Sequence, residues 1–271
     1  MYQKTLDLFA DLAASKAQAM RSNLAGFLIA SAMAGAYVGV GILLIFTIGQ
    51  TIDPSVRSLA MGASFGVALT LVVFAGSELF TGHTMMMTLG LLRGVVGWGD
   101  LSASWLLTWI GNLAGSVILA WLFYQGGGGQ ILKEGADLIF NVSAYKMNSP
   151  AGALVARGIL CNWLVCLALW TSARATSDAA KCILIFWRLF AFIACGFEHS
   201  VANMTIFAVA LLGNHPASVS FSGMAHNLAW VTLGNAIAGA FFMAGAYWRV
   251  NGATKTISTA PVRASLPAAA E

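Results

Sequence analysis

Charged residues are scarce in this sequence. Only 9% of its 271 residues are Asp, Glu, Lys or Arg, whereas 59% are hydrophobic and the mean hydropathy is +0.79. A soluble domain typically has about 25% charged residues, so the composition excludes one and predicts an integral membrane protein. The basic residues flank apolar segments instead of forming a patch, and the net charge is only +4. Nucleic acid is therefore excluded as a partner.

Metal and redox ligands are also few. The four cysteines show neither metal-ligand spacing nor a disulfide pattern, so we interpret all four as small core residues: Cys161, Cys166, Cys182 and Cys195. A membrane-bound redox or haem protein needs several converging intramembrane ligands, and here His199 stands nearly alone. We predict no enzyme activity, no catalytic residue, no metal and no cofactor, and keep the redox or haem protein as the alternative from a different class.

A cleavable signal is missing as well. The first twenty residues lack an apolar core. They do place Leu6, Phe9, Ala10, Ala13 and Ala17 on one helical face. This pattern predicts an amphipathic cytoplasmic helix over residues 1–22, lying against the membrane or the helical bundle.

Long charge-free gaps mark the membrane spans, because roughly 20 apolar residues cross the hydrocarbon. Four uninterrupted spans are predicted at about 24–49, 102–125, 157–174 and 223–247. Two more apolar segments, 58–95 and 183–213, contain polar interruptions at 76–84 and 196–204. Each interruption combines a glycine, a glutamate and small hydroxyl or amide residues. Such residues suit a backbone that leaves the helix and rejoins it.

The two halves of the chain repeat one pattern. Gly76 and Glu78 recur 120 residues later as Gly196 and Glu198, and Gly111-Asn112 recurs 123 residues later as Gly234-Asn235. Three spans per half is an odd number, so the second half is expected to be inverted. The predicted fold is an all-α membrane protein of six transmembrane helices in an inverted 3+3 repeat, with the second and fifth helices broken. Broken helices at matching positions of inverted halves point to a transport site.

The domain limits follow from the same pattern. The transmembrane channel domain is predicted over 23–250, with halves at about 23–126 and 153–250, and a flexible cytoplasmic tail over 251–271. Lys and Arg are more frequent in the loops on the side of the termini, so both termini are expected in the cytoplasm.

A restarted helix directs free N–H groups and a partial positive charge at the break. Two such restarts facing one midplane favour an anion. His199 is the only histidine placed both at a break and near midspan, and histidine titrates nearest neutral pH. We hypothesise that a weak-acid anion shares or accepts a proton near His199, so that the neutral acid crosses an apolar constriction.

At these residues a known family becomes recognisable. The stretches AGSELFTGHTM (75–85), GILCNWLVCLALW (158–170) and FIACGFEHSVANMT (192–205) resemble the formate/nitrite transporter family. The form SELFTGHTM, the GNHP that follows the second break and AMAGAYVGVGILLIFTIG in the first span resemble its nitrite-channel branch. The resemblance implies an aquaporin-like six-helix protomer, a homopentamer and a separate pore in each protomer.

The resemblance also implies residue roles. Leu79 matches the cytoplasmic constriction, and Phe65, Leu69 and Phe192 match the apolar periplasmic lining. The matched pathway residues are a central histidine, the threonine that bonds it, a polar residue of the fourth span and an anion-attracting lysine: His199, Thr81, Asn162 and Lys146. Arg188 falls where an uncharged residue is expected.

The remaining polar residues of the breaks are given structural roles. Glu78 and Glu198 are expected to accept loop N–H groups and cap the restarted helices, because carboxylates facing the path repel an anion. Asn112 and Asn235 are expected to tie the broken loops to neighbouring helices. For His83, gating and a structural role stay open.

The function expected from the whole pattern is a nitrite channel or transporter of the bacterial inner membrane. Formate is the alternative substrate, and hydrosulfide is a more distant one, because the choice of nitrite rests on the branch resemblance. Channel-like and proton-coupled passage both stay open. A purely structural membrane scaffold is a third class, but it gives no reason to break two helices symmetrically.

Overall fold

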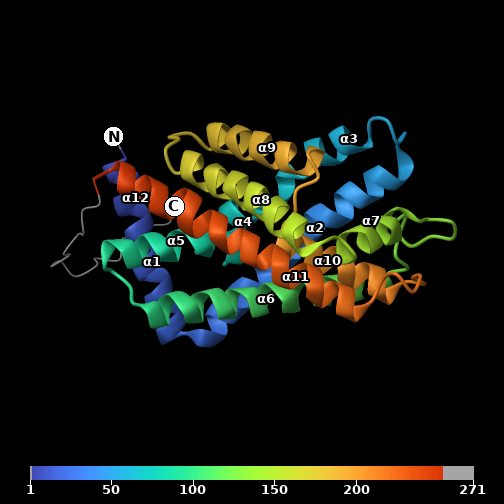
Figure 1. The fold of residues 1–271 in the computed structure, drawn as a ribbon, viewed down its shortest axis with the longest axis horizontal. Coiled ribbons are helices and arrows are strands. Elements are labelled where there is room, and N and C mark those ends of the chain that lie inside the picture. The colour runs from blue at the N-terminus through green and yellow to red at the C-terminus, as the bar shows by residue number, and fades with distance from the viewer. Residues whose placement is uncertain (1, 253–271) are drawn as a thin grey trace, which may run out of the picture.

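The computed structural model describes residues 2–252, and within that range the chain is helical and has no strand. Most of the helices run near the long axis of the molecule, whereas α1 crosses it at the end where α12 lies, and α7 lies at the other end (Figure 1). Their bounds are α1 Gln3–Ser22, α2 Leu24–Thr51, α3 Arg57–Ser64, α4 Gly66–Phe74, α5 Phe80–Arg93, α6 Trp98–Gln125, α7 Leu138–Met147, α8 Ala151–Ser172, α9 Asp178–Ala194, α10 Ser200–Leu212, α11 Phe221–Ile237, the π-helix η1 Ala238–Gly245 and α12 Ala246–Val250.

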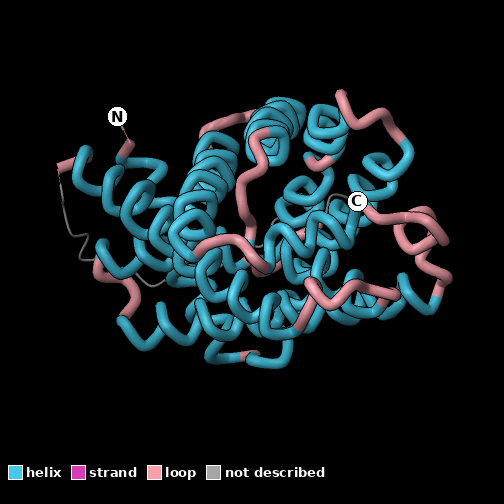
Figure 2. Tube along the Cα trace, turned by 45° about the vertical axis from the view of Figure 1, so that its right-hand side comes forward, coloured by secondary structure: helices cyan, strands magenta, loops and turns pink. Residues whose placement is uncertain are grey.

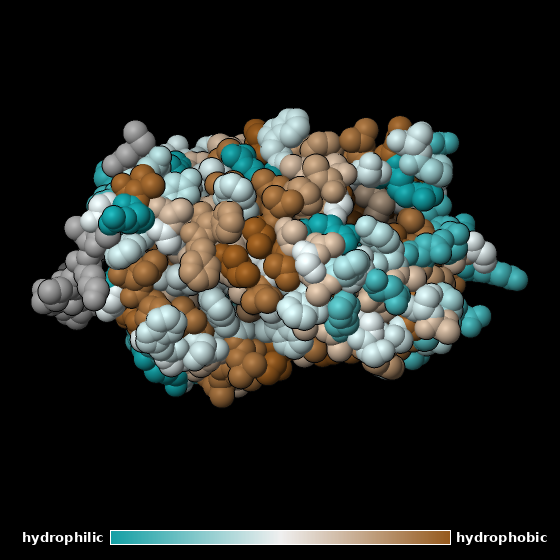
Figure 3. All heavy atoms as spheres, in the orientation of Figure 1, coloured by the Kyte–Doolittle hydropathy of each residue, from teal (hydrophilic) through white to brown (hydrophobic). Residues whose placement is uncertain are grey.

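Five of the described helical segments are long and apolar enough to cross a membrane: Leu24–Thr51, Arg57–Phe74, Trp98–Gln125, Ala151–Ser172 and Phe221–Val250. Hydrophobic residues cover the middle of the molecular surface and hydrophilic ones gather toward the ends (Figure 3). The chain is therefore a multi-pass membrane protein. The six-span count, the inversion of the second half and the domain limits stay predictions, and residues 253–271 of the expected tail lie outside the described range.

The span predicted at 102–125 begins earlier, at Trp98. Asp100 lies in its first turn, and its carboxylate accepts the Gly97 N–H at 3.2 Å. An acidic side chain is favourable at a helix N-terminus. Asp100 therefore lies inside the first turn of the helix, whereas the charge-free gap predicts a span that begins after it.

Both expected breaks are present. Helix α4 ends at Phe74 and α5 begins at Phe80, while α9 ends at Ala194 and α10 begins at Ser200. The breaks therefore cover 75–79 and 195–199, and the second half of each predicted interruption is helical. Loop segments run through the interior of the bundle as well as at its ends (Figure 2). Gly76 and Gly196 have φ values of +75° and +70°, a left-handed backbone that glycine adopts without strain.

Glycines allow two helix pairs to approach closely. A Cβ on Gly115 of α6 would lie 1.8 Å from the Ala32 carbonyl oxygen of α2. A Cβ on Gly234 of α11 would lie 2.4 Å from the Val155 carbonyl oxygen of α8. Close backbone contact through small residues is the usual way membrane helices pack. These two pairs, one in each half, hold the broken helices between them.

The N-terminal helix packs as its pattern predicted. Leu6, Phe9, Ala10, Ala13 and Ala17 are all buried, and α1 lies against α5 and Trp170 of α8. Asp7 of α1 forms an ion pair with Arg93 at the end of α5. The amphipathic face is therefore covered by the protein itself.

The interpretation of all four cysteines as core residues is wrong for one of them. Cys161 and Cys166 are buried, and Cys182 is half-buried, but Cys195 is exposed. Cys195 is the first residue of the second break, where the helix stops and leaves its side chain uncovered.

Candidate permeation site

The first broken loop is held by a single asparagine. The Asn112 side chain accepts the Phe80 N–H at 2.9 Å, and its amide nitrogen donates to the carbonyl oxygens of Ser31 at 2.7 Å and Glu78 at 2.9 Å. The Glu78 N–H donates to the Ala30 carbonyl at 3.2 Å. Backbone groups released by the break are thus satisfied within the protein, as membrane depth requires.

The second loop repeats this arrangement. The Asn235 side chain accepts the Ser200 N–H at 2.9 Å and donates to the carbonyl oxygens of Gly158 at 2.8 Å and Glu198 at 3.1 Å. The Glu198 N–H donates to the Arg157 carbonyl at 3.2 Å. The two halves therefore share a hydrogen-bond pattern as well as a sequence pattern.

Replacing Asn235 by alanine is expected to lower the thermal stability of the protein markedly. Each buried group left unsatisfied costs about 1–3 kcal/mol, and the variant strands the Ser200 N–H and two carbonyls. Asn141→Ala is the matched control, because Asn141 is exposed on α7 and bonds only the nearby Asp137 carboxylate. Equal unfolding temperatures for both variants in detergent would contradict a clamping role for Asn235.

The Glu78 carboxylate binds side chains. It accepts from Lys16 Nζ of α1 at 2.5 Å and lies 2.6 Å from His83 Nε2, and His83 Nδ1 is 2.6 Å from Ser104 Oγ. The carboxylate of Glu198 likewise accepts from Lys146 Nζ at 2.8 Å and Asn203 Nδ2 at 2.6 Å. The expectation that these carboxylates accept loop N–H groups is wrong for the described residues. The Asn112 and Asn235 side chains instead accept the first N–H of each restarted helix, and the glutamates bind polar side chains.

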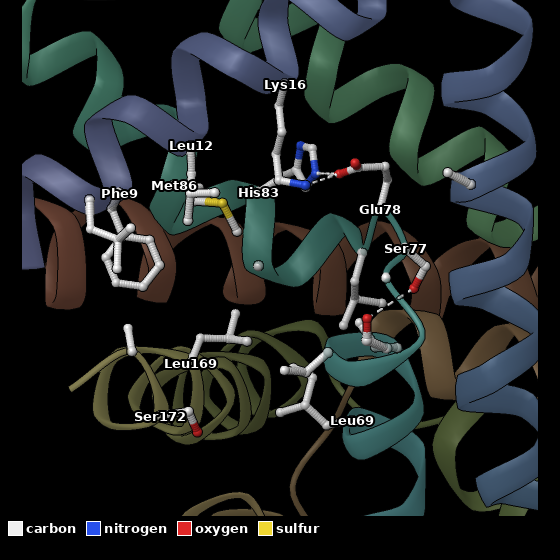
Figure 4. Close-up of a pocket in the computed structure, with 18 of the residues that line it drawn as sticks. Phe9, Leu12, Lys16, Leu69, Ser77, Glu78, His83, Met86, Leu169 and Ser172 are labelled. Atoms are coloured by element: carbon white, nitrogen blue, oxygen red, sulfur yellow. Dashed lines mark hydrogen bonds and ion pairs between the residues drawn. The ribbon is translucent and has the colours of Figure 1, made fainter. Parts of the chain in front are cut away.

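A cavity of about 450 Å³, here named the α1 cavity, lies beside the first loop. Phe9, Leu12 and Lys16 of α1 line one side of it (Figure 4), and Leu69, Glu78 and Leu79 also belong to its lining. Figure 4 shows Lys16 and His83 both directed at the Glu78 carboxylate. The cavity is mainly apolar, with these charged groups where the loop meets α1.

A separate chamber of about 10 Å³ lies deeper in the bundle. Its lining is apolar apart from one imidazole: Val38, Phe65, Ala68, Leu69, Leu79, Val165, Leu189, Phe192 and His199. Its volume is about that of one water molecule. Leu69 and Leu79 line both spaces, so they separate the chamber from the α1 cavity. Phe65 and Phe192 meet edge to face at 5.5 Å. The chamber is therefore closed by apolar side chains.

His199 and Thr81 join the two restarted helices. His199 caps the start of α10, Thr81 lies in the first turn of α5, and His199 Nε2 is 3.2 Å from Thr81 Oγ1. Both residues are at most 4% exposed. Two positive helix ends and two polar side chains thus meet at one buried point.

The hydrogen bonds define the state of the imidazole. His199 Nδ1 accepts the Ala202 N–H at 3.1 Å, so this nitrogen carries no proton. The proton of the neutral ring is then on Nε2, the nitrogen next to Thr81 Oγ1. If Nε2–H donates to Thr81, the threonine hydroxyl proton is free for a second acceptor.

Of the four expected pathway residues, only His199 lines the chamber, while Thr81 contacts His199 Nε2 from outside the lining. Asn162 donates to the carbonyl oxygens of Thr81 at 3.3 Å and Asn235 at 2.7 Å and to Thr84 Oγ1 at 3.0 Å, so it links α5 to α11. Lys146 lies in helix α7 and pairs with Glu198. Direct contact of either with a permeant stays a prediction. Arg188 donates to the Leu184 carbonyl of its own helix at 3.2 Å and lines neither space.

Sequence reasoning missed the partners of the break residues. Lys16, Ser104, Arg157, Asn203 and Asn227 gave no individual signal, but two spacings could have found some of them. His83 and Asn203 each follow a break glutamate by five residues, and Ser104 and Asn227 are 123 residues apart. The Asn203 amide donates to Asn227 Oδ1 at 2.8 Å, in the place of the His83–Ser104 contact.

The family model described as formate/nitrite transporter matches residues 4–249. The chain belongs to the formate/nitrite transporter family. A relative within this family, the nitrite transporter NirC of Escherichia coli (strain K12), is 52% identical over 248 residues, which is 92% of both chains.

Solved structures of this family have the same fold. One, titled as an FNT family ion channel, superposes with a TM-score of 0.89 at 51% identity, covering 92% of this chain and 99% of the other. Another, titled as a pentameric formate channel with formate bound, gives a TM-score of 0.71 at 27% identity, covering 86% and 99%. The protein is thus a membrane transporter of the formate/nitrite type.

Proposed function

We propose that this chain moves nitrite across the bacterial inner membrane through the chamber at His199. The observation that carries the proposal is that two helix N-termini meet at the bonded pair His199 and Thr81, and that His199 lines an apolar chamber. The identity of 52% with a protein named as a nitrite transporter supports the choice of nitrite. Transport, and not catalysis, is the activity proposed.

The apolar residues set the energetic problem. A bare anion in low-dielectric surroundings costs far more than helix dipoles recover, since the dipoles give only about 0.3–2 kcal/mol. Passage between Leu79 and the Phe65–Phe192 pair therefore needs the charge to be neutralised. A neutral weak acid is small enough to move through constrictions that open only briefly.

His199 Nε2 is the atom that shares a proton with the permeant, because Nδ1 is occupied by the Ala202 N–H. A neutral ring that gave its proton away completely would become an imidazolate. The net proton therefore enters with the anion, and His199 and Thr81 bind the acid while it is neutral. Under this proposal one proton moves with each nitrite, and lower pH increases flux.

Formate is the second candidate, because a solved formate channel shares the fold at 27% identity. Formate and nitrite are both small, planar, singly charged conjugate bases, so the chamber binds either by the same contacts. Hydrosulfide is a more distant candidate of the same charge.

The proposal extends to assembly and topology. The pentameric title of the formate-channel structure supports a homopentamer with one pore in each protomer. We place both termini in the cytoplasm on the basis of the Lys and Arg distribution, so that the α1 cavity opens inward. Six spans in two inverted halves and a channel domain over 23–250 complete this arrangement.

Flux assays in proteoliposomes test the function. Purified protein is expected to accelerate nitrite uptake over empty liposomes, with formate competing and chloride ineffective, because chloride is not the base of a weak acid. No uptake above empty liposomes, or equal competition by chloride, contradicts the proposal. A visible haem absorption band in the purified protein would favour the redox alternative.

A further inference from the structure

The two break glutamates have different charge surroundings. At the first break Lys16 and Glu78 pair one to one, and nearby Lys181 pairs with Asp178 at 2.8 Å. At the second break Glu198 lies near two cations, Lys146 at 2.8 Å and Arg157 at 3.7 Å. One positive charge is therefore left over, beside the residue that precedes His199.

Lys146 is the partner that neutralises Glu198. Its Nζ makes the shorter contact, and both Lys146 and Asn203 bond the same carboxylate oxygen, Oε2. The Glu198 side chain is 1% exposed. Removing Lys146 therefore leaves a buried carboxylate whose remaining cation, Arg157, lies 3.7 Å away. The charge of Lys146 is thus used within the protein.

Arg157 is held so that part of its guanidinium stays available. Its Nη1 donates to the Tyr145 hydroxyl at 3.1 Å, its Nε donates to the Ala153 carbonyl at 3.3 Å, and its Cζ lies 5.2 Å from the centre of the Tyr145 ring. Within residues 2–252, no acceptor bonds Nη2. The side chain is 19% exposed, so solvent reaches it.

The repeat shows that this cation is a feature of one half. The carbonyl of Arg157 accepts the Glu198 N–H, and at the first break the carbonyl of Ala30 accepts the Glu78 N–H. Ala30 lines the α1 cavity. The matching position is therefore a small neutral residue beside the α1 cavity in the first half and an arginine in the second half, while its backbone role is the same.

We propose that the pathway opens between α7 and α8, here called the α7–α8 mouth, and that Arg157, and not Lys146, attracts the permeant anion there. This inference rests on the proposed function, since it assigns a role to a residue of the same pathway. The attraction acts through the net charge of the guanidinium, whose Nη2 has two N–H donors without an acceptor in residues 2–252. Tyr145 fixes the position of the charge without neutralising it.

A charge at a mouth acts on association. Removing that charge lowers the rate at which the anion is captured and makes this rate less dependent on salt, while the steps after capture are unchanged. We expect Arg157→Gln to lower kcat/KM for nitrite roughly three- to tenfold at low ionic strength, with kcat unchanged. The difference is expected to shrink as salt rises from about 0.01 M to about 0.3 M, because the Debye length falls. The substitution keeps the backbone carbonyl that bonds Glu198.

Two further variants separate attraction from structure. Lys133→Gln is the matched control, because Lys133 is an exposed cation in the loop before α7 and its loss is expected to leave kcat/KM unchanged. Lys146→Gln is expected to lower thermal stability and kcat, because it leaves the Glu198 carboxylate buried without its nearest cation. Arg157→Lys is expected to retain most of the low-salt kcat/KM.

The outcomes are distinct. No nitrite flux by the unaltered protein refutes the proposed function itself. If that flux is present and Arg157→Gln matches Lys133→Gln at low salt, the attraction role is wrong. A loss of kcat that persists at high salt likewise makes Arg157 structural and overturns the inference. Should Arg157→Gln not reconstitute, Arg157→Lys decides: retained low-salt kcat/KM supports attraction, and its loss refutes it.

Discussion

Replacing His199 by phenylalanine is expected to abolish most nitrite flux and to change its pH dependence. Phenylalanine has no nitrogen to accept the Ala202 N–H or to bond Thr81 Oγ1, so the chamber loses its central donor. A buried hydrogen bond left unmade costs about 1–3 kcal/mol, which corresponds to roughly 5- to 150-fold in flux. Initial rates of nitrite and formate uptake, measured in proteoliposomes across a range of pH, test this result.

His199→Asn provides the control for the helix cap. Asparagine is a good N-cap residue, so it can accept the Ala202 N–H and preserve the start of α10, but it does not titrate. We expect this variant to fold as well as the unaltered protein while its flux responds differently to pH. If His199→Phe transports nitrite with the original pH profile and selectivity, the proton-sharing role of His199 is wrong.

The breaks were predictable because they change local composition. Glycine, glutamate and small polar residues interrupt two apolar segments at matching positions, and the structure breaks both helices there. Their extent was overestimated, since Phe80–Thr84 and Ser200–Met204 are helical. Polar residues such as Thr81 and Asn203 have partners in the protein interior, His199 and Glu198. A polar residue in an apolar segment therefore does not by itself indicate a loop.

Long-range pairs were not predictable from local pattern. The contacts Lys16–Glu78 and Arg157–Glu198 join residues 62 and 41 positions apart, and no periodicity encodes such distances. The internal repeat is the exception, because it relates two sets of contacts to each other. Once Glu78, His83 and Ser104 are seen together, the offsets of 120 and 123 lead to Glu198, Asn203 and Asn227.

Departures from the repeat are as informative as the repeat itself. An offset of 120 aligns Leu79 with His199, so one restarted helix begins after a leucine and the other after a histidine. Both residues line the chamber. A symmetric scaffold therefore yields a single polar point beside an apolar barrier, and the two halves contribute different chemistry to one path.

Replacing Gly115 by alanine is expected to prevent normal folding, because this one methyl group meets backbone. The added Cβ would lie 1.8 Å from the Ala32 carbonyl oxygen, 2.6 Å from its carbonyl carbon and 2.9 Å from its Cα. A side chain could turn away, but α2 itself must move, and α2 also carries Ser31, whose carbonyl accepts from Asn112. Overpacking typically costs about 1–3 kcal/mol, and a rigid backbone places this variant at or above that range.

Gly99→Ala is the matched control, since Gly99 lies in the same helix α6 and has nothing within 4 Å of its added Cβ. Alanine there is expected to raise helix stability slightly, by up to about 1 kcal/mol. Size-exclusion profiles and unfolding temperatures in detergent measure both variants. Because the Asn112 side chain bonds the carbonyls of Ser31 in α2 and Glu78 in the loop, displacement of α2 also disturbs the loop that carries Glu78 and Leu79. A folded Gly115→Ala protein with unaltered nitrite flux would therefore contradict both the close contact of α6 with α2 and the coupling of that contact to the loop that carries Leu79.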